Sequence, residues 1–114
     1  MSAVETYIRA WQERDPDARA RLLEQCFAAD GRFVTRGRVF QGRAALAQLM
    51  ASTHADPQLL AIRVVSAIDA VGRTFRFRAV VDRADGTSPE TFEAGELDDA
   101  GRIATILTFP GPLV

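Results

Sequence analysis

Apolar residues in the first half of the chain recur with the period of an α-helix. One set has the i, i+3, i+4, i+7 spacing that defines a single helix face, and its members are Val4, Tyr7, Ile8 and Trp11. Asp15-Pro16 predicts the start of a second helix, because Asp is a favoured N-cap and Pro suits the first helical position. A third helix is predicted over residues 43–53, before Asp56-Pro57 ends it.

The second half alternates apolar and polar residues with the period of a β-strand. Strands are predicted at 32–35 with 38–41, then at 59–69, 74–82, 90–98 and 102–109. Three helices followed by an antiparallel meander indicate a single α+β domain over residues 1–114, with the helices covering one face of the sheet. A sheet curved strongly around them forms a cone, whose open mouth is a natural pocket.

Composition narrows the class of function. Hydrophobic residues make up 47% and charged residues 25% of the chain, which is typical of a globular domain. The net charge is −1 with acids interleaved among the arginines, so no nucleic-acid partner is predicted. One Cys and one His predict no disulfide and no metal site. No signal peptide or membrane span is apparent, so a cytoplasmic location with no membrane partner is expected.

Four stretches together resemble the SnoaL-like branch of the nuclear transport factor 2-like (NTF2-like) superfamily. They are YIRAWQERDPDARARLLEQCFAADGRF, FQGRAALAQLM, FRFRAVVDRADG and GELDDAGRIATILTFPGPL. Their order and spacing carry the resemblance, which covers nearly the whole chain. It implies a cystatin-like cone-shaped fold, a homodimer formed through the outer sheet face, and a relationship to polyketide cyclases and ketosteroid isomerases. Fold is implied more firmly than reaction, because one fold hosts many functions.

The resemblance also implies roles for particular residues. Ketosteroid isomerases use a tyrosine and a late-strand acid as donors to an oxyanion, and a carboxylate as the base. These positions fall on Tyr7, Glu93 and Thr35. A threonine hydroxyl cannot serve as the base, so this sequence departs from the isomerases there. SnoaL-like cyclases use a late-strand acid to protonate a ketone without a metal, and the candidates for it are Glu93 first and Glu96 second.

Two other residues are candidates for the missing base. Asp30 precedes Gly31 in a predicted turn, where an Asp also simply bonds nearby backbone amides. His54 closes the third helix, where it either stabilises the helix C-terminus or acts as a general base at the pocket mouth. Both interpretations stay open for each residue.

Strand pairing decides where Glu93 points. Pairing 74–82 with 90–98 across their loop predicts residue 79 opposite 93, and an ion pair between Arg76 and Glu96. Glu93 then shares an apolar face with Phe75 and Phe77, where a carboxyl tends to keep its proton. A slip of one residue would move it to the other face.

The sequence supports two functions almost equally. The first is a cofactor-independent cyclase or isomerase that acts on a small hydrophobic ketone by acid–base catalysis. The second is a non-catalytic small-molecule binding or dimeric interaction domain on the same fold. In either case aromatic residues are expected to line the core or the pocket, and the predicted substrate contacts are Trp11, Phe33, Phe77, Phe92 and Phe109.

Overall fold

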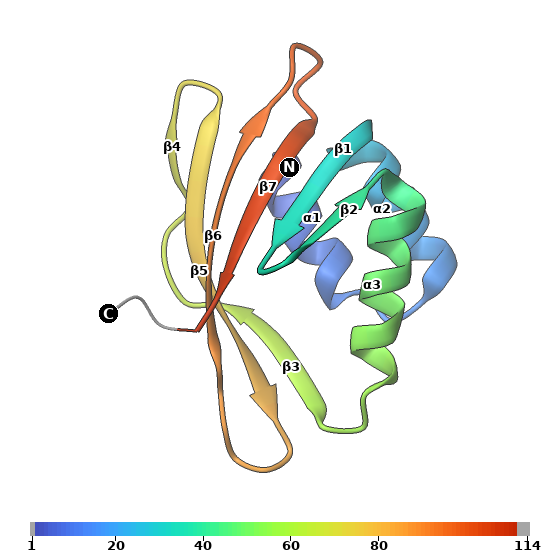
Figure 1. Cartoon of the computed structure of the whole chain (residues 1–114), viewed down its shortest axis with the longest axis vertical. Coiled ribbons are helices and arrows are strands. Elements are labelled where there is room, and N and C mark those ends of the chain that lie inside the picture. Colours follow the sequence, from blue (N-terminus) through green and yellow to red (C-terminus); the bar gives the residue numbers. More distant parts are fainter. Residues whose placement is uncertain (1, 112–114) are drawn as a thin grey trace.

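The computed structural model describes residues 2–111 as three helices and one seven-stranded sheet (Figure 1). The helices are α1 (Ala3–Gln12), α2 (Pro16–Cys26) and α3 (Arg43–Ala55). The strands are β1 (Phe27–Thr35), β2 (Arg38–Gln41), β3 (Leu59–Val64), β4 (Asp69–Val71), β5 (Thr74–Arg83), β6 (Glu90–Leu97) and β7 (Ile103–Pro110). None of the described helices is long and apolar enough to cross a membrane.

The helices α2 and α3 begin where the sequence predicts, and α1 begins at a capping box. The Ser2 side chain accepts a hydrogen bond from the Glu5 amide in a capping box at the start of α1. The Asp15 carboxylate accepts one from the Ala18 amide at 2.9 Å, and Pro16 occupies the first turn of α2. α3 follows Gly42, whose φ of 87° lies in the region that favours glycine.

The sheet is mixed, because one of its strand pairs is parallel. Its strand order is β2-β1-β7-β6-β5-β3, with β4 pairing on β5. β1 runs parallel to β7, whereas the other pairs are antiparallel. Figure 1 shows all three helices gathered on one face of the curved sheet. The α+β cone is therefore confirmed, but the prediction that it is antiparallel throughout is wrong for this one pair.

The core lies between the helices and the inner face of the sheet. Tyr7, Phe27, Leu46 and Met50 lose essentially all of their exposed surface there. β5 and β7 supply the opposing wall, with Phe75, Phe77, Ile103 and Ile106. Cys26 is also buried, and burial raises the pKa of its thiol to about 12. It therefore behaves as a small apolar residue of the core.

Three details of the predicted strands need correction. The strand predicted over residues 59–69 is two strands, since β3 ends at Val64 and β4 begins at Asp69. Asp30 and Gly31 lie inside β1 rather than in a turn, because α2 passes directly into the strand at Phe27. A β-bulge between Phe27 and Arg32 absorbs the transition. The predicted Arg76–Glu96 ion pair is also wrong, since Arg76 pairs with Asp69 on β4 at 2.8 Å.

Candidate active site

A cavity of about 100 Å³ lies inside the cone, between α1, the end of α3 and the inner face of the sheet. Its wall is almost entirely apolar. The residues that line it are Tyr7, Ile8, Trp11, Phe33, Thr53, Ile62, Val64, Phe77, Ala79, Val81, Thr91, Glu93 and Thr108. Glu93 is the only carboxylic acid among them.

Glu93 points inward because of the strand register. β5 and β6 pair with Phe77 opposite Glu93, two residues away from the predicted register. Side chains alternate with a period of two along a strand, so a two-residue error leaves the face unchanged. Glu93 is 7% exposed and shares its face with Phe77, as predicted.

Tyr7 and Glu93 form a buried hydrogen-bonded pair. The Tyr7 hydroxyl, with no exposed surface, donates to Glu93 Oε1 at 2.9 Å. The Thr108 hydroxyl, directly across the β6–β7 ladder, donates to the same oxygen at 3.3 Å. Because Oε1 accepts both bonds, the neutral carboxyl carries its proton on Oε2.

The pocket shifts both ionisable groups toward their neutral forms. Burial raises the pKa of Glu93 to about 7, because the carboxylate loses its hydration. Hydrogen bonds from Tyr7, Thr108 and Thr91 oppose this by stabilising the charged form. Burial, and next the nearby Glu93 charge, raise the pKa of Tyr7 well above its usual value. At neutral pH Tyr7 keeps its proton, while Glu93 can both give and accept one.

Trp11, Phe33 and Phe77 line the cavity, in agreement with their predicted place. The rings of Trp11 and Phe33 meet with centroids 5.9 Å apart. Phe92 and Phe109 do not line it. They follow inward-facing neighbours on β6 and β7, so alternation turns them to the outer face, where their rings pack 6.3 Å apart.

The structure does not bring either predicted base into the cavity. Asp30 is exposed on β1, on the stretch that precedes Phe33. His54 Nε2 donates to the Trp11 carbonyl at 2.6 Å and ties the end of α3 to the end of α1. Thr35 lines a separate shallow hollow beside Leu107 and Phe109. The residues that line the cavity thus supply an acid without a second titratable base.

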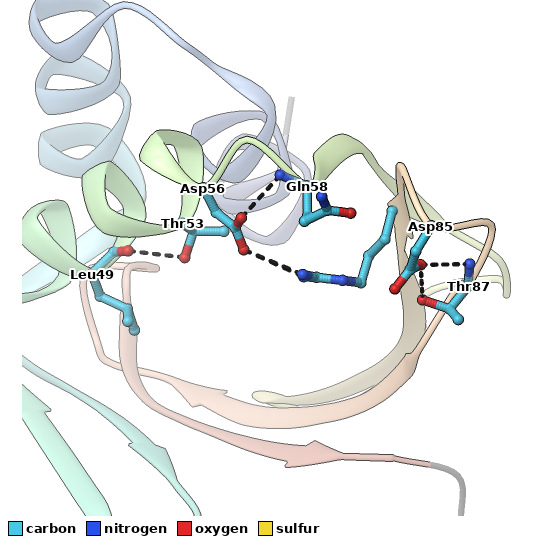
Figure 2. A network of polar contacts seen from close by, with 7 residues as sticks. Leu49, Thr53, Asp56, Gln58, Asp85 and Thr87 are labelled. Carbon is cyan, nitrogen blue, oxygen red and sulfur yellow. Dashed lines mark hydrogen bonds and ion pairs between the residues drawn. The ribbon is translucent and has the colours of Figure 1, made fainter.

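We take the mouth of the cavity to lie between α3 and the β5–β6 hairpin, because the cavity shares lining residues with a hollow there. A wider hollow of about 430 Å³ lies there and shares Thr53, Val81 and Thr91 with the inner cavity. Figure 2 shows the polar network along this rim, where Asp56 accepts from the Gln58 amide at 2.9 Å. Asp56 also contacts the Arg83 guanidinium at 3.4 Å. Thr53 donates its hydroxyl proton to the Leu49 carbonyl, so that proton is engaged within α3.

Sequence reasoning missed the threonines that surround the carboxyl. Thr91 lies two residues before Glu93 on β6, and Thr108 on β7 is the cross-strand partner of Glu93. The alternation of β7 could have revealed Thr108, since it shares a face with the buried Ile106. Within residues 2–111 no group of three His, Cys, Asp or Glu side chains is arranged to hold a metal ion.

Comparison with solved structures identifies the fold class. The chain has the cone-shaped fold of SnoaL-like and NTF2-like proteins. A candidate isomerase of the SnoaL-like family from Agrobacterium tumefaciens superposes with a TM-score of 0.86, at 22% identity over 96% of this chain and 95% of that one. A candidate polyketide cyclase from Sinorhizobium meliloti gives 0.75, at 21% identity over 93% and 92% of the two chains.

An NTF2-like protein of unknown function from Exiguobacterium also gives a TM-score of 0.75, at 18% identity over 98% of this chain and all of that one, 100%. The sequence matches no protein-family model and no curated protein. At these identities the likeness establishes the fold, and the reaction has to be argued from the cavity itself.

Proposed function

We propose that this protein is a cofactor-independent isomerase or cyclase that acts on a small apolar ketone. Glu93 gives a proton to the ketone oxygen, and Tyr7 holds the carboxyl in place. The observation that carries this proposal is a single carboxyl, hydrogen-bonded to a buried tyrosine, facing an otherwise apolar cavity. The candidate isomerase and cyclase among the structural neighbours are consistent with it.

One carboxyl is sufficient for isomerisation and for cyclisation, because each reaction only rearranges the atoms of the substrate. In enolisation the carbonyl oxygen takes the Glu93 proton while an α-proton leaves to solvent, and solvent then reprotonates the carboxylate. In ring closure a carbon–carbon bond forms as the carbonyl electrons move to oxygen, which takes the Glu93 proton. The enol that supplied the electrons releases its own proton and restores the neutral carboxyl.

The volume of the cavity limits the size of the ligand. A dry apolar cavity of about 150 Å³ admits benzene, and the cavity in this protein is smaller, at about 100 Å³. It therefore encloses at most a short chain or part of one ring, and a ring such as that of cyclohexanone would extend into the mouth near Thr53 and Thr91. A four-ring steroid does not fit inside.

Deuterium exchange into a simple ketone tests the proposal. Cyclohexanone in D₂O should gain α-deuterium faster with the protein than without it, as followed by NMR. Glu93→Gln should slow this catalysed exchange about 100-fold or more, because general acids contribute on that scale. The matched control is Glu96→Gln, the same change at an exposed site on the same strand, which should leave the exchange unchanged. Equal rates in both variants would overturn the assignment.

The alternative function is binding without turnover. It is favoured by the absence of Asp30 and His54 from the residues that line the cavity. Under this alternative cyclohexanone binds, as measured by calorimetry, yet its exchange rate equals that in buffer. The two measurements together separate an enzyme from a binding protein.

We also propose that the outer sheet face forms a homodimer. Leu107 and Phe109 are 38% and 44% exposed on that face, and Phe92 packs beside Phe109. Large apolar side chains gathered on an open sheet face are typical of an interaction surface. This association is compatible with either function of the cavity.

A further inference from the structure

Trp11 carries a buried hydrogen-bond donor that has no partner. Its indole Nε1 has no partner within residues 2–111, although the atom is shielded from solvent. Buried polar groups are nearly always paired, so such an exception calls for an explanation. The hydrogen-bonding partner that the N–H lacks can be supplied by whatever fills the adjacent cavity.

The fold directs this indole toward the polar end of the cavity. Trp11 lies one helical turn after Tyr7 on α1, and both side chains line the cavity. Burial raises the pKa of the Tyr7 hydroxyl, and the nearby Trp11 indole opposes part of this rise. The indole N–H nevertheless makes no hydrogen bond to Tyr7. The indole N–H therefore lies at the end of the cavity where Tyr7 and Glu93 form their hydrogen bond.

Trp11 is also held firmly in place. Its ring packs on Phe33, and its carbonyl accepts the 2.6 Å hydrogen bond from His54. The next residue, Gln12, donates from its side chain to the Ile62 carbonyl on β3 at 3.1 Å. A donor fixed on a rigid element orients a ligand better than one on a mobile side chain.

We propose that the Trp11 Nε1–H donates a hydrogen bond to the oxygen of the bound ligand and makes the cavity selective for carbonyl compounds over hydrocarbons of the same shape. This inference rests on the proposed function, because it concerns the ligand of the same cavity. Trp11 is already a predicted substrate contact through its ring, and the new element is a polar role for its N–H, to which the resemblance to ketosteroid isomerases and cyclases assigned nothing.

The chemistry of the donors explains the selectivity. A carbonyl oxygen has two lone pairs, so it can accept from Trp11 Nε1–H and from the neutral Glu93 carboxyl together. A hydrocarbon leaves both donors unpaired and gains only contact with the apolar wall. A site built to hydrogen-bond an oxygen rejects an analogue that lacks it, because its buried donors then stay unsatisfied.

A matched pair of ligands tests this point directly. Cyclohexanone and methylenecyclohexane share a ring and an exocyclic double bond, but only the ketone accepts hydrogen bonds. Trp11 is the one tryptophan in the chain, so a ¹H–¹⁵N spectrum contains one indole signal. Cyclohexanone should move the indole proton downfield, as hydrogen bonding does, and methylenecyclohexane should not.

Affinity measured by calorimetry gives the second readout. Replacing Trp11 by β-(3-benzothienyl)alanine exchanges the N–H for sulfur and keeps the bicyclic ring. The ketone should then bind about tenfold more weakly, while the affinity for methylenecyclohexane stays the same. Trp11→Phe should weaken the binding of both ligands, because its ring is smaller. It should weaken the binding of the ketone further, because the N–H is lost.

The outcomes distinguish this inference from the proposed function. If both ligands bind but the indole signal responds equally to each, and the isostere weakens neither selectively, Trp11 is not a donor and the cavity still binds ligands. If neither ligand binds to the unaltered protein, the proposed function and this inference both fail. A downfield shift for the ketone alone, lost affinity for it alone, or both, supports the inference.

Discussion

The Tyr7 hydroxyl donates a hydrogen bond of 2.9 Å to Glu93, a residue 86 positions further along the chain. The contact joins the first helix to a late strand inside an apolar cavity. It couples the position of α1 to the protonation of the carboxyl, because the bond stabilises the charged form of Glu93.

Removing the Tyr7 hydroxyl should raise the pKa of Glu93. The hydrogen bond from Tyr7 favours the carboxylate and is the largest effect opposing burial. Tyr7→Phe therefore leaves burial less opposed, and the titration of the carboxyl, followed by infrared spectroscopy, should move to higher pH. Thr108→Val is the matched control and should cause a smaller rise. An unchanged or lower pKa in Tyr7→Phe would show that the pair is not coupled.

Stability should depend on pH through Glu93. Its pKa rises from 4.5 to about 7 on folding, so the folded state binds more protons than the unfolded state between those values. The stabilising contribution is complete below pH 4.5 and is lost as the pH rises through about 7. The loss amounts to about 3 kcal/mol in the free energy of unfolding.

Chemical denaturation of the protein and of Glu93→Gln over this pH range measures that contribution. The glutamine mimics the neutral carboxyl and cannot titrate. The unfolding free energy of the unaltered protein minus that of Glu93→Gln should therefore fall as the pH rises to about 7, and then level off. A difference that stays constant across the range means that Glu93 has an ordinary pKa in the folded protein.

Gly95 should not tolerate a side chain. A Cβ at this position would lie 2.5 Å from the Thr105 carbonyl oxygen and 2.6 Å from Cζ of Phe75. The backbone oxygen cannot move aside within the sheet, so Gly95→Ala should lower the free energy of unfolding by about 2–4 kcal/mol. Ala94→Ser, on the opposite face of β6, should change it by less than about 0.5 kcal/mol. Equal stability of the two variants would contradict the packing.

The outer sheet face should control association. Leu107→Glu places a charge on that face and should convert a dimer to a monomer at micromolar concentration, as measured by light scattering. The control is Leu60→Glu, at an exposed leucine on β3, which should leave the mass unchanged. A monomeric unaltered protein would rule out the proposed homodimer, while the function of the cavity would be unaffected.

Local sequence signals predicted the helices and the inward direction of Glu93. The Asp15-Pro16 cap and the four-residue spacing of Tyr7 and Trp11 act within one or two turns of chain, so a single sequence reveals them. The predicted direction of Glu93 was correct despite an error of two residues in the register, because the face depends only on whether the shift is odd or even.

Long-range pairing was beyond such reasoning. The parallel pairing of β1 with β7 joins two strands that are far apart in the sequence, and nothing in either strand alone selects that partner. Asp30 was misplaced because an Asp-Gly pair is typical of turns, whereas a bulge in β1 accommodates it. The error at Phe92 was avoidable, since the alternation that turns Glu93 inward turns its neighbour outward.

The most direct test of this account is the pKa of Glu93 in the folded protein. A ¹³C NMR titration of the glutamate side-chain carboxyls, with Glu93→Gln to assign the signal, yields the value without any knowledge of the substrate. We predict a midpoint at about pH 7, as required of a proton donor in an apolar cavity. A midpoint near 4.5 would mean that the carboxyl is ionised at neutral pH, and Glu93 could not be the acid that we propose.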